Sequence, residues 1–117
     1  MKIVDGKTFL GMPVNTVFAA YEPLGIFGPI GFKGKSIEND FFEMQILGIK
    51  ADAKNDIFAE DILMEAEAGS CSFELDMHGE GRNGEFETDQ LYAVFEKKDV
   101  EDLISRLQEC IPKEGIV

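Results

Sequence analysis

The octapeptide Cys71-Ser72-Phe73-Glu74-Leu75-Asp76-Met77-His78 alternates between apolar and polar residues without a break. Successive side chains of a β-strand point to opposite faces, so this period of two predicts a strand over residues 71–78. One face of that strand would be apolar and the other wet and acidic. Such a division is typical of an antiparallel sheet that covers a core on one side.

A helix is predicted on each side of this strand. Before it, Asn55 or Asp56 caps a helix that Gly69 ends. After it, a second helix begins at Lys98 or Asp99. Spacings of three and four place the apolar residues of each helix on one face, and we expect both faces to pack on the sheet. The two stripes are Phe58, Ala59, Ile62, Leu63 and Ala66, then Val100, Leu103, Ile104, Leu107 and Ile111.

Four further stretches, residues 16–21, 30–37, 40–47 and 91–96, are predicted to be strands. The order βββ-α-β-β-α indicates an α+β fold, with a mostly antiparallel five-stranded sheet and two long helices packed on it. The length of 117 residues predicts one domain, residues 1–117. In the strand at 30–37, Phe32 should point inward and Lys33 outward. The predicted core consists of Val17, Phe42, Met44, Ile46, Ile62, Leu63, Phe73, Leu75, Leu103, Ile104 and Leu107.

The charge is concentrated in the middle of the chain. The net charge is −12, from 23 acidic and 11 basic residues. Residues 1–55 hold six acids and six lysines, whereas residues 56–96 hold twelve acids and one base, a net charge of −11. Such a field repels nucleic-acid phosphates and attracts basic surfaces, so direct nucleic-acid binding is not expected. The alternative interpretation is that the charge serves solubility alone.

The sequence carries few signs of chemistry. Cys71 and Cys110 do not form a Cys-x-x-Cys pair, and we expect both to be reduced packing residues in a cytoplasm. His78 is the single histidine, so Cys and His alone cannot complete a zinc site. No uncharged run reaches the roughly 20 residues of a membrane span, and no secretory signal is visible. We therefore expect no cofactor, no metal and no membrane association.

Residues 76–87 resemble a calcium-binding loop in part, with an acid at position one, Gly at six and Glu at twelve. His78 at position three and Glu80 at five depart from that pattern, and the flanking stretches are predicted strands. A glycine-rich loop between two strands is therefore the preferred interpretation. The apolar loop at residues 24–30 should fold back onto the core, or mark a contact patch if it stays exposed.

Three stretches together resemble a family of small uncharacterised proteins encoded by bacteriophages and prophages. They are residues 12–23 (MPVNTVFAAYEP), 39–42 (NDFF) and 89–100 (DQLYAVFEKKDV), and the similarity spans about residues 9–108. In the family pattern a Gly precedes Thr-Val-Phe, where this chain has Asn15, and an Arg-Asp-Gly turn is matched by Arg82-Asn83-Gly84. The resemblance implies a phage context in a bacterial host and assigns no catalytic residue.

Two hypotheses of function follow. The first is a binding protein that blocks a host protein that handles nucleic acid, such as a defence nuclease, by presenting carboxylates where phosphates normally lie. Its partner would be a basic protein surface, and its contact residues would be Glu60, Asp61, Glu65, Glu74, Asp76, Glu80, Glu85, Glu87 and Asp89. The second is a metal-dependent enzyme or ligand binder that uses Glu74, Asp76, His78 and Glu80. A phage accessory or assembly protein without an acid-based mechanism is a third possibility.

Overall fold

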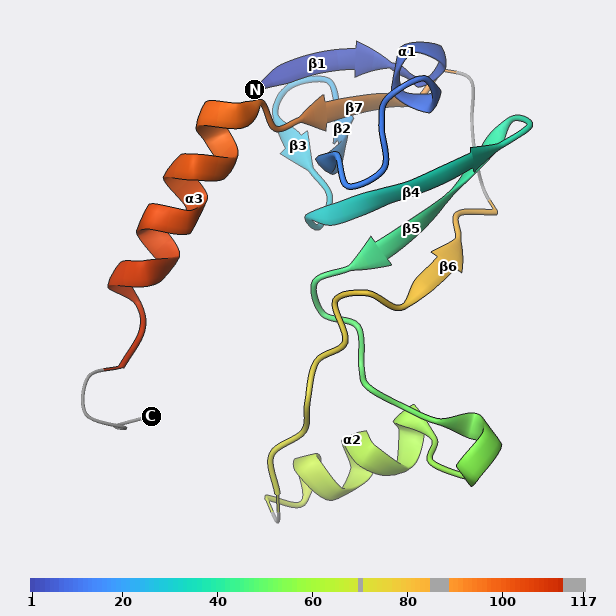
Figure 1. Ribbon diagram of the computed structural model, residues 1–117, viewed down its shortest axis with the longest axis vertical. Coiled ribbons are helices and arrows are strands. Elements are labelled where there is room, and N and C mark those ends of the chain that lie inside the picture. The colour runs from blue at the N-terminus through green and yellow to red at the C-terminus, as the bar shows by residue number, and fades with distance from the viewer. Residues whose placement is uncertain (70, 85–88, 113–117) are drawn as a thin grey trace.

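The computed structural model describes residues 1–69, 71–84 and 89–112. The fold is α+β, as predicted, and is built on an open antiparallel sheet with the strand order β1-β7-β2-β4-β5-β6 and with β3 paired to β2 (Figure 1). The strands are β1 Lys2–Asp5, β2 Val17–Glu22, β3 Ile26–Phe27, β4 Gly31–Ile37, β5 Asp40–Gln45, β6 Glu80–Arg82 and β7 Leu91–Val94. The helices are α1 Gly6–Leu10, α2 Ala59–Glu67 and α3 Lys97–Glu109, with a 3-10 turn, η1, at Ala53–Asn55.

The molecule has two lobes and a projecting helix. The sheet and α1 form a body at the top of Figure 1, and residues 46–79 leave it as a lower lobe that carries η1 and α2. Helix α3 leaves the sheet after β7 and runs beside the gap between the lobes (Figure 1). The radius of gyration is 16.7 Å, against about 13 Å for a compact domain of this length. The chain is therefore more extended than an ordinary globular domain.

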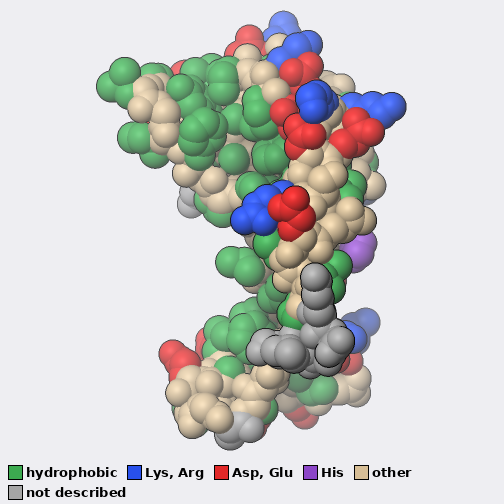
Figure 2. All heavy atoms as spheres, turned by 90° about the vertical axis from the view of Figure 1, so that its left-hand side faces the viewer, with side chains coloured by type: hydrophobic (Ala, Val, Ile, Leu, Met, Phe, Trp, Pro, Cys, Tyr) green, Lys and Arg blue, Asp and Glu red, His purple; other side chains and the backbone are tan. Residues whose placement is uncertain are grey.

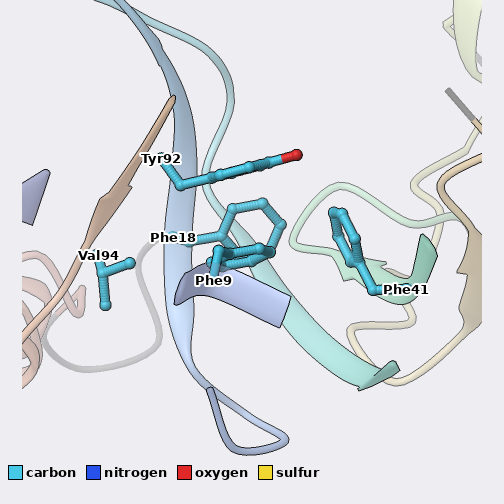
Figure 3. Close-up of a cluster of buried hydrophobic side chains, with 5 residues drawn as sticks. All are labelled: Phe9, Phe18, Phe41, Tyr92 and Val94. Atoms are coloured by element: carbon cyan, nitrogen blue, oxygen red, sulfur yellow. The ribbon is translucent and has the colours of Figure 1, made fainter. Parts of the chain in front are cut away.

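The core lies between α1 and one face of the sheet. Asp5 caps α1 by accepting a 2.7 Å hydrogen bond from the Thr8 N–H, and this short helix lays Phe9 across the strands. The Phe9 ring stacks on Tyr92 of β7 at 4.1 Å and lies 4.7 Å from Phe18 of β2 (Figure 3). Aromatic side chains dominate burial energetics, so this cluster holds the central strands together.

The predicted strand at 71–78 is not formed. Its stretch makes one isolated bridge, between Ile49 and Leu75, and the strand that follows β5 in the sheet is β6. Phe73 and Leu75, both predicted core residues, are 43% and 40% exposed. Residues 71–78 do alternate in sequence, but they have no neighbouring strand to pair with. The reason is that residues 46–52, which follow β5, leave the sheet together with them. The sheet also gains the short strands β1, β3 and β6, so the prediction of five strands was wrong.

Two strands turn a different face to the core than predicted. In β2, Phe18 and Ala19 are buried and Val17 is half-buried, and in β5 Phe41 is buried where Phe42 was expected. Met44 is buried as predicted, and Ile46 is half-buried. The physical reason is that α1 covers the other face of the sheet, where its Phe9 packs against Phe18 and Phe41 at 4.7 and 5.0 Å.

The two long helices form but do not pack on the sheet. Helix α3 begins within two residues of its predicted start, whereas α2 begins at Ala59 after Phe58, so the predicted cap at Asn55 or Asp56 was wrong: Asp56 ends the 3-10 turn η1 instead. Neither α2 nor α3 contains a buried residue. Ile62, Leu63 and Leu103 are half-buried, whereas Ile104 and Leu107 are 51% and 56% exposed. Helix α3 is tied at its base, where the Met1 amino group contacts Asp99 at 2.5 Å and Glu96 at 3.3 Å. The predicted packing of both helices on the sheet was therefore wrong.

Candidate functional site

The lower lobe is held by a few backbone contacts between two extended segments. The Asp76 N–H donates to the Gly48 carbonyl at 2.7 Å, and the Lys50 N–H donates to the Glu74 carbonyl at 3.2 Å. Gly48 allows this approach, because a Cβ there would lie 2.4 Å from the Asp76 carbonyl oxygen. Among the described residues of the lobe, 46–69 and 71–79, none is fully buried. The lobe therefore has little core of its own.

A groove of about 630 Å³ opens between α2 and the segment at residues 71–76. Ile57, Ile62 and Phe73 provide apolar parts of its lining, and carboxylates surround them. The Glu74 carboxylate pairs with the Lys50 ammonium at 3.0 Å, with both side chains largely exposed. The acidic residues that line the groove are Asp52, Glu65, Glu74 and Asp76.

The lobe is strongly acidic as a whole. Residues 46–79 carry eight acids and two lysines, a net charge of −6. Glu60 and Asp61 lie in the first turn of α2, where carboxylates interact favourably with the positive end of the helix dipole. Figure 2 shows acidic side chains at the edges of this lobe, next to hydrophobic side chains that reach its surface. Exposed apolar groups in the lobe include Phe58, Met64 and Phe73.

The structure brings some of the predicted contact residues together and separates others. Glu65, Glu74 and Asp76 line the groove, and Glu60 and Asp61 lie on the helix that forms one wall. Glu80 belongs to β6 in the sheet body, and Asp89 is an exposed residue before β7. Glu85 and Glu87 lie outside the described residues.

The alternative set of Glu74, Asp76, His78 and Glu80 is not one cluster. Glu74 points to the groove, whereas His78 lines a different hollow together with Met44 and Met77. Within residues 1–69, 71–84 and 89–112, no three His, Cys, Asp or Glu side chains are placed to hold a metal ion. The partial calcium-loop pattern is also interrupted, because Glu80–Arg82 pairs with β5 as a strand. Asp76 turns back instead and accepts a 2.9 Å hydrogen bond from the His78 N–H.

Both cysteines were predicted to be packing residues, and both are exposed. Cys71 lies at the groove, with its thiol 3.8 Å from the Glu65 carboxylate. Cys110 ends α3 and contacts the Arg106 carbonyl at 3.4 Å. Their exposure follows from the same cause as that of the helix stripes, since the elements that carry them do not pack on the body.

A buried carboxylate that the sequence did not reveal is Asp40, which is 7% exposed. It accepts hydrogen bonds from the Arg82 side chain at 2.8 Å, the Gly84 N–H at 2.9 Å and the Phe41 N–H at 2.8 Å. Burial acts to raise its pKa, but the hydrogen bonds outweigh burial and the pKa is lowered. Asp40 thus anchors the turn at residues 82–84 on the β4–β5 hairpin.

Lys33 was predicted to face solvent and is 1% exposed. Its ammonium donates to the Ser36 hydroxyl at 2.9 Å and to the Gly34 carbonyl at 3.1 Å, and lies 5.9 Å from the centre of the Phe9 ring. Burial lowers its pKa. Lys33 lies two residues after Gly31, the partner of Phe18, and is therefore on the face of the sheet that α1 covers.

The loop at residues 24–30 does not fold back onto the core as expected. Leu24 is fully exposed at φ +77°, and Ile26 and Phe27 are each 59% exposed. Figure 2 shows a hydrophobic area on the upper body. A shallow hollow beside it is lined by Pro29, Ile30, Gln45, Ile46 and Leu47. The hairpin is therefore an exposed apolar patch separate from the acidic groove.

Comparison with protein-family profiles, with curated protein sequences and with solved structures found no match to this chain. In the part of the chain that the structure describes, no helix combines the length and the apolar character that crossing a bilayer requires. The fold and the groove define an α+β protein with an acidic, partly apolar groove.

Proposed function

We propose that this chain is a small acidic binding protein whose lower lobe docks on a basic surface of another protein. The observation that carries the proposal is the groove in which Glu65, Glu74 and Asp76 surround exposed apolar side chains. Carboxylates that steer a basic partner and apolar groups that become buried on contact are the two parts of an effective protein interface.

The exposed apolar side chains of the lower lobe support a docking role independently of its charge. Phe58, Met64 and Phe73 are exposed in the lobe, and large side chains of this kind are the ones that anchor interfaces when a partner covers them. The charged rim then governs the rate of encounter and the choice of partner. A surface that served solubility alone would not need aromatic groups beside its carboxylates.

The thin internal packing of the lobe agrees with a docking role. The described lobe residues include none that is fully buried, and two extended segments join them to the sheet body. Segments with few buried contacts open locally at low free energy. A partner that covers the groove would add the missing buried surface and stabilise the lobe.

The partner we propose is a host protein that handles nucleic acid. The net charge of −11 over residues 56–96 and the resemblance to phage-encoded proteins support this choice. A basic surface that normally binds phosphates would accept carboxylates in their place, so the chain would compete with DNA or RNA for it. The proposed setting is the cytoplasm of a bacterial host.

The test compares two triple variants with the same change in charge. Glu60, Glu65 and Glu74 are changed to Lys in the lobe, and Glu22, Glu80 and Asp89 are changed to Lys in the body. Proteins captured from host lysate by the wild-type chain are identified, and binding to each purified candidate is measured with and without a competing DNA duplex.

We expect the lobe variant to lose the partner, the body variant to keep it, and DNA to displace the wild-type chain. Equal binding by the two variants would contradict the docking surface. A partner that the lobe variant loses but that DNA does not displace would support the docking surface and reject the nucleic-acid-handling class.

A further inference from the structure

Helix α3 exposes an apolar stripe along its whole length. Val100 and Leu103 are half-buried near its base, and Ile104, Leu107 and Ile111 are 51%, 56% and 66% exposed. The stripe recurs at spacings of three and four, so it occupies one side of the helix. Figure 1 shows α3 standing clear of both lobes. An isolated helix of 13 residues is marginal in water, and most helical stability comes from packing of the apolar side.

The accessible surface of the chain is larger than that of a compact monomer of the same mass. A compact monomer of 13.0 kDa exposes about 6,300 Å². This chain exposes 8845 Å², roughly 2,500 Å² more than that expectation. A specific interface takes about 800 Å² from each partner, so the excess is enough for contacts at α3 as well as at the lobe.

The charges of α3 indicate what covers it. Residues 97–109 carry three basic and four acidic side chains, a net charge of −1, and several are paired within the helix. Lys98 pairs with Asp102 at 3.1 Å, and Arg106 with Glu109 at 3.1 Å. Helix α2, by contrast, carries four acids and no base over residues 59–67. A basic partner would therefore prefer α2, whereas a second α3 meets little repulsion at α3.

We infer that α3 packs against α3 of a second copy of this chain, as an antiparallel pair about a two-fold axis. A pair of this kind is isologous, so the same stripe serves both copies. Antiparallel packing opposes the two helix dipoles. It also keeps the two acidic bodies at opposite ends of the helix pair.

The register follows from the stripe. With the two-fold axis at Ser105, Leu103 of one copy faces Leu107 of the other, and Val100 faces Cys110. The two Cys110 residues then lie about 15 Å apart along the helix axis, too far for a disulfide between them. A parallel pair would place them side by side.

The mass of the purified chain as a function of concentration tests the pairing. We expect sedimentation at about 1–200 µM to show a monomer–dimer equilibrium in the micromolar range, because a pair of short helices is near the lower end of interface sizes. Any affinity tag is placed at the C-terminus, since the Met1 amino group contacts Glu96 and Asp99. A monomer throughout that range would overturn the inference.

Matched variants separate pairing from folding. Ile104→Lys with Leu107→Lys should abolish the dimer and leave the circular dichroism of the sheet unchanged, because neither side chain is buried in the body. Ser105→Lys with Glu109→Gln changes the charge by the same two units on the opposite side of α3 and should keep the dimer. Dimers of equal strength in both variants would place the contact elsewhere.

Oxidation tests the orientation in a chain that also carries Cys71→Ser. With Cys110 alone, we expect no disulfide-linked dimer. With Val100→Cys added, we expect a linked dimer, because each new thiol faces Cys110 of the other copy. A linked dimer from Cys110 alone would overturn the antiparallel arrangement.

Discussion

Asn15 occupies a backbone position that most residues avoid. Its φ is +72°, in the left-handed region where glycine is favoured and asparagine is tolerated. The position opens β2, because the Asn15 N–H donates to the Lys33 carbonyl at 2.7 Å. A glycine at this position would adopt the same conformation without strain.

Substitution of Asn15 should therefore follow backbone preference rather than side-chain size. Asn15→Gly is expected to match or exceed the wild-type melting temperature, and Asn15→Val to lose about 1–2 kcal/mol, the cost of a left-handed conformation for a residue with a branched Cβ. Chemical denaturation of the three proteins measures the difference. Equal stability of the Gly and Val variants would show that the backbone relaxes there.

The buried amine of Lys33 should make the stability of the folded chain depend on pH. Burial lowers its pKa in the folded chain, whereas the unfolded chain has the ordinary value. Between those two pKa values the unfolded chain binds more protons, so this residue's contribution to stability improves as pH rises. The penalty is fully present below the folded pKa and disappears by the unfolded pKa.

Lys33→Met removes the buried charge. We expect the variant to gain most on the wild-type chain at pH values below the folded pKa of Lys33, with the difference in melting temperature shrinking over the interval from that value up to the ordinary lysine pKa of about 10.4. The exposed Lys35→Met is the control for a lost surface charge. A difference between Lys33→Met and wild type that does not change with pH would show that the amine does not titrate in that interval.

At the scale of elements, the sequence predicted which segments form but not what they contact. The ends of α3 and the role of Gly69 after α2 follow from capping and glycine preferences, which are local. The burial of Lys33 depends on which face of the sheet α1 covers, and the exposure of Leu107 depends on where α3 leaves the sheet. An apolar stripe shows that a helix requires a partner, and it does not show which surface provides one.

The lower lobe depends on the close approach of its two segments at Gly48. A Cβ at this position would lie 2.4 Å from the Asp76 carbonyl oxygen, so Gly48→Ala should push the segments apart. We expect amide exchange across residues 46–79 to accelerate about tenfold or more, equivalent to roughly 1.4 kcal/mol of local stability. The β2 and β7 amides should keep their protection.

Gly81→Ala is the matched control for that variant. A Cβ at Gly81 would meet no neighbouring atom within 4 Å, and the backbone there is not left-handed. Exchange in the lower lobe should therefore remain at the wild-type rate. Equal exchange in the lobe for both alanine variants would mean that the contact at Gly48 does not hold it closed.

At the scale of the whole molecule, the acidic segment at residues 56–96 is divided between the lower lobe and the sheet body. Glu65, Glu74 and Asp76 line one groove, because they are close in sequence and lie in the part of the chain that leaves the sheet. Glu80 was assigned to the same surface and lies on β6, since strand pairing with β5 is a long-range contact. Composition identifies a charged segment of the sequence, but sheet topology determines which of its residues lie on one surface.

The two proposed interfaces should respond to salt in opposite directions. Two copies of a chain with net charge −12 repel each other, and the α3 contact is apolar. The screening length falls from about 10 Å at 0.1 M salt to about 3 Å at 1 M, so added salt should strengthen the α3 pair. Binding of the acidic lobe to a basic partner gains from attraction between unlike charges, so the same salt should weaken it. Sedimentation of the chain alone and titration with its partner over one salt series measure both effects.

Self-association that weakens with salt would show an ionic contact between copies and contradict the apolar pair. Partner binding that is indifferent to salt would move the docking surface from the acidic groove to an apolar one, for which the β2–β3 hairpin around Leu24 is the best-placed candidate.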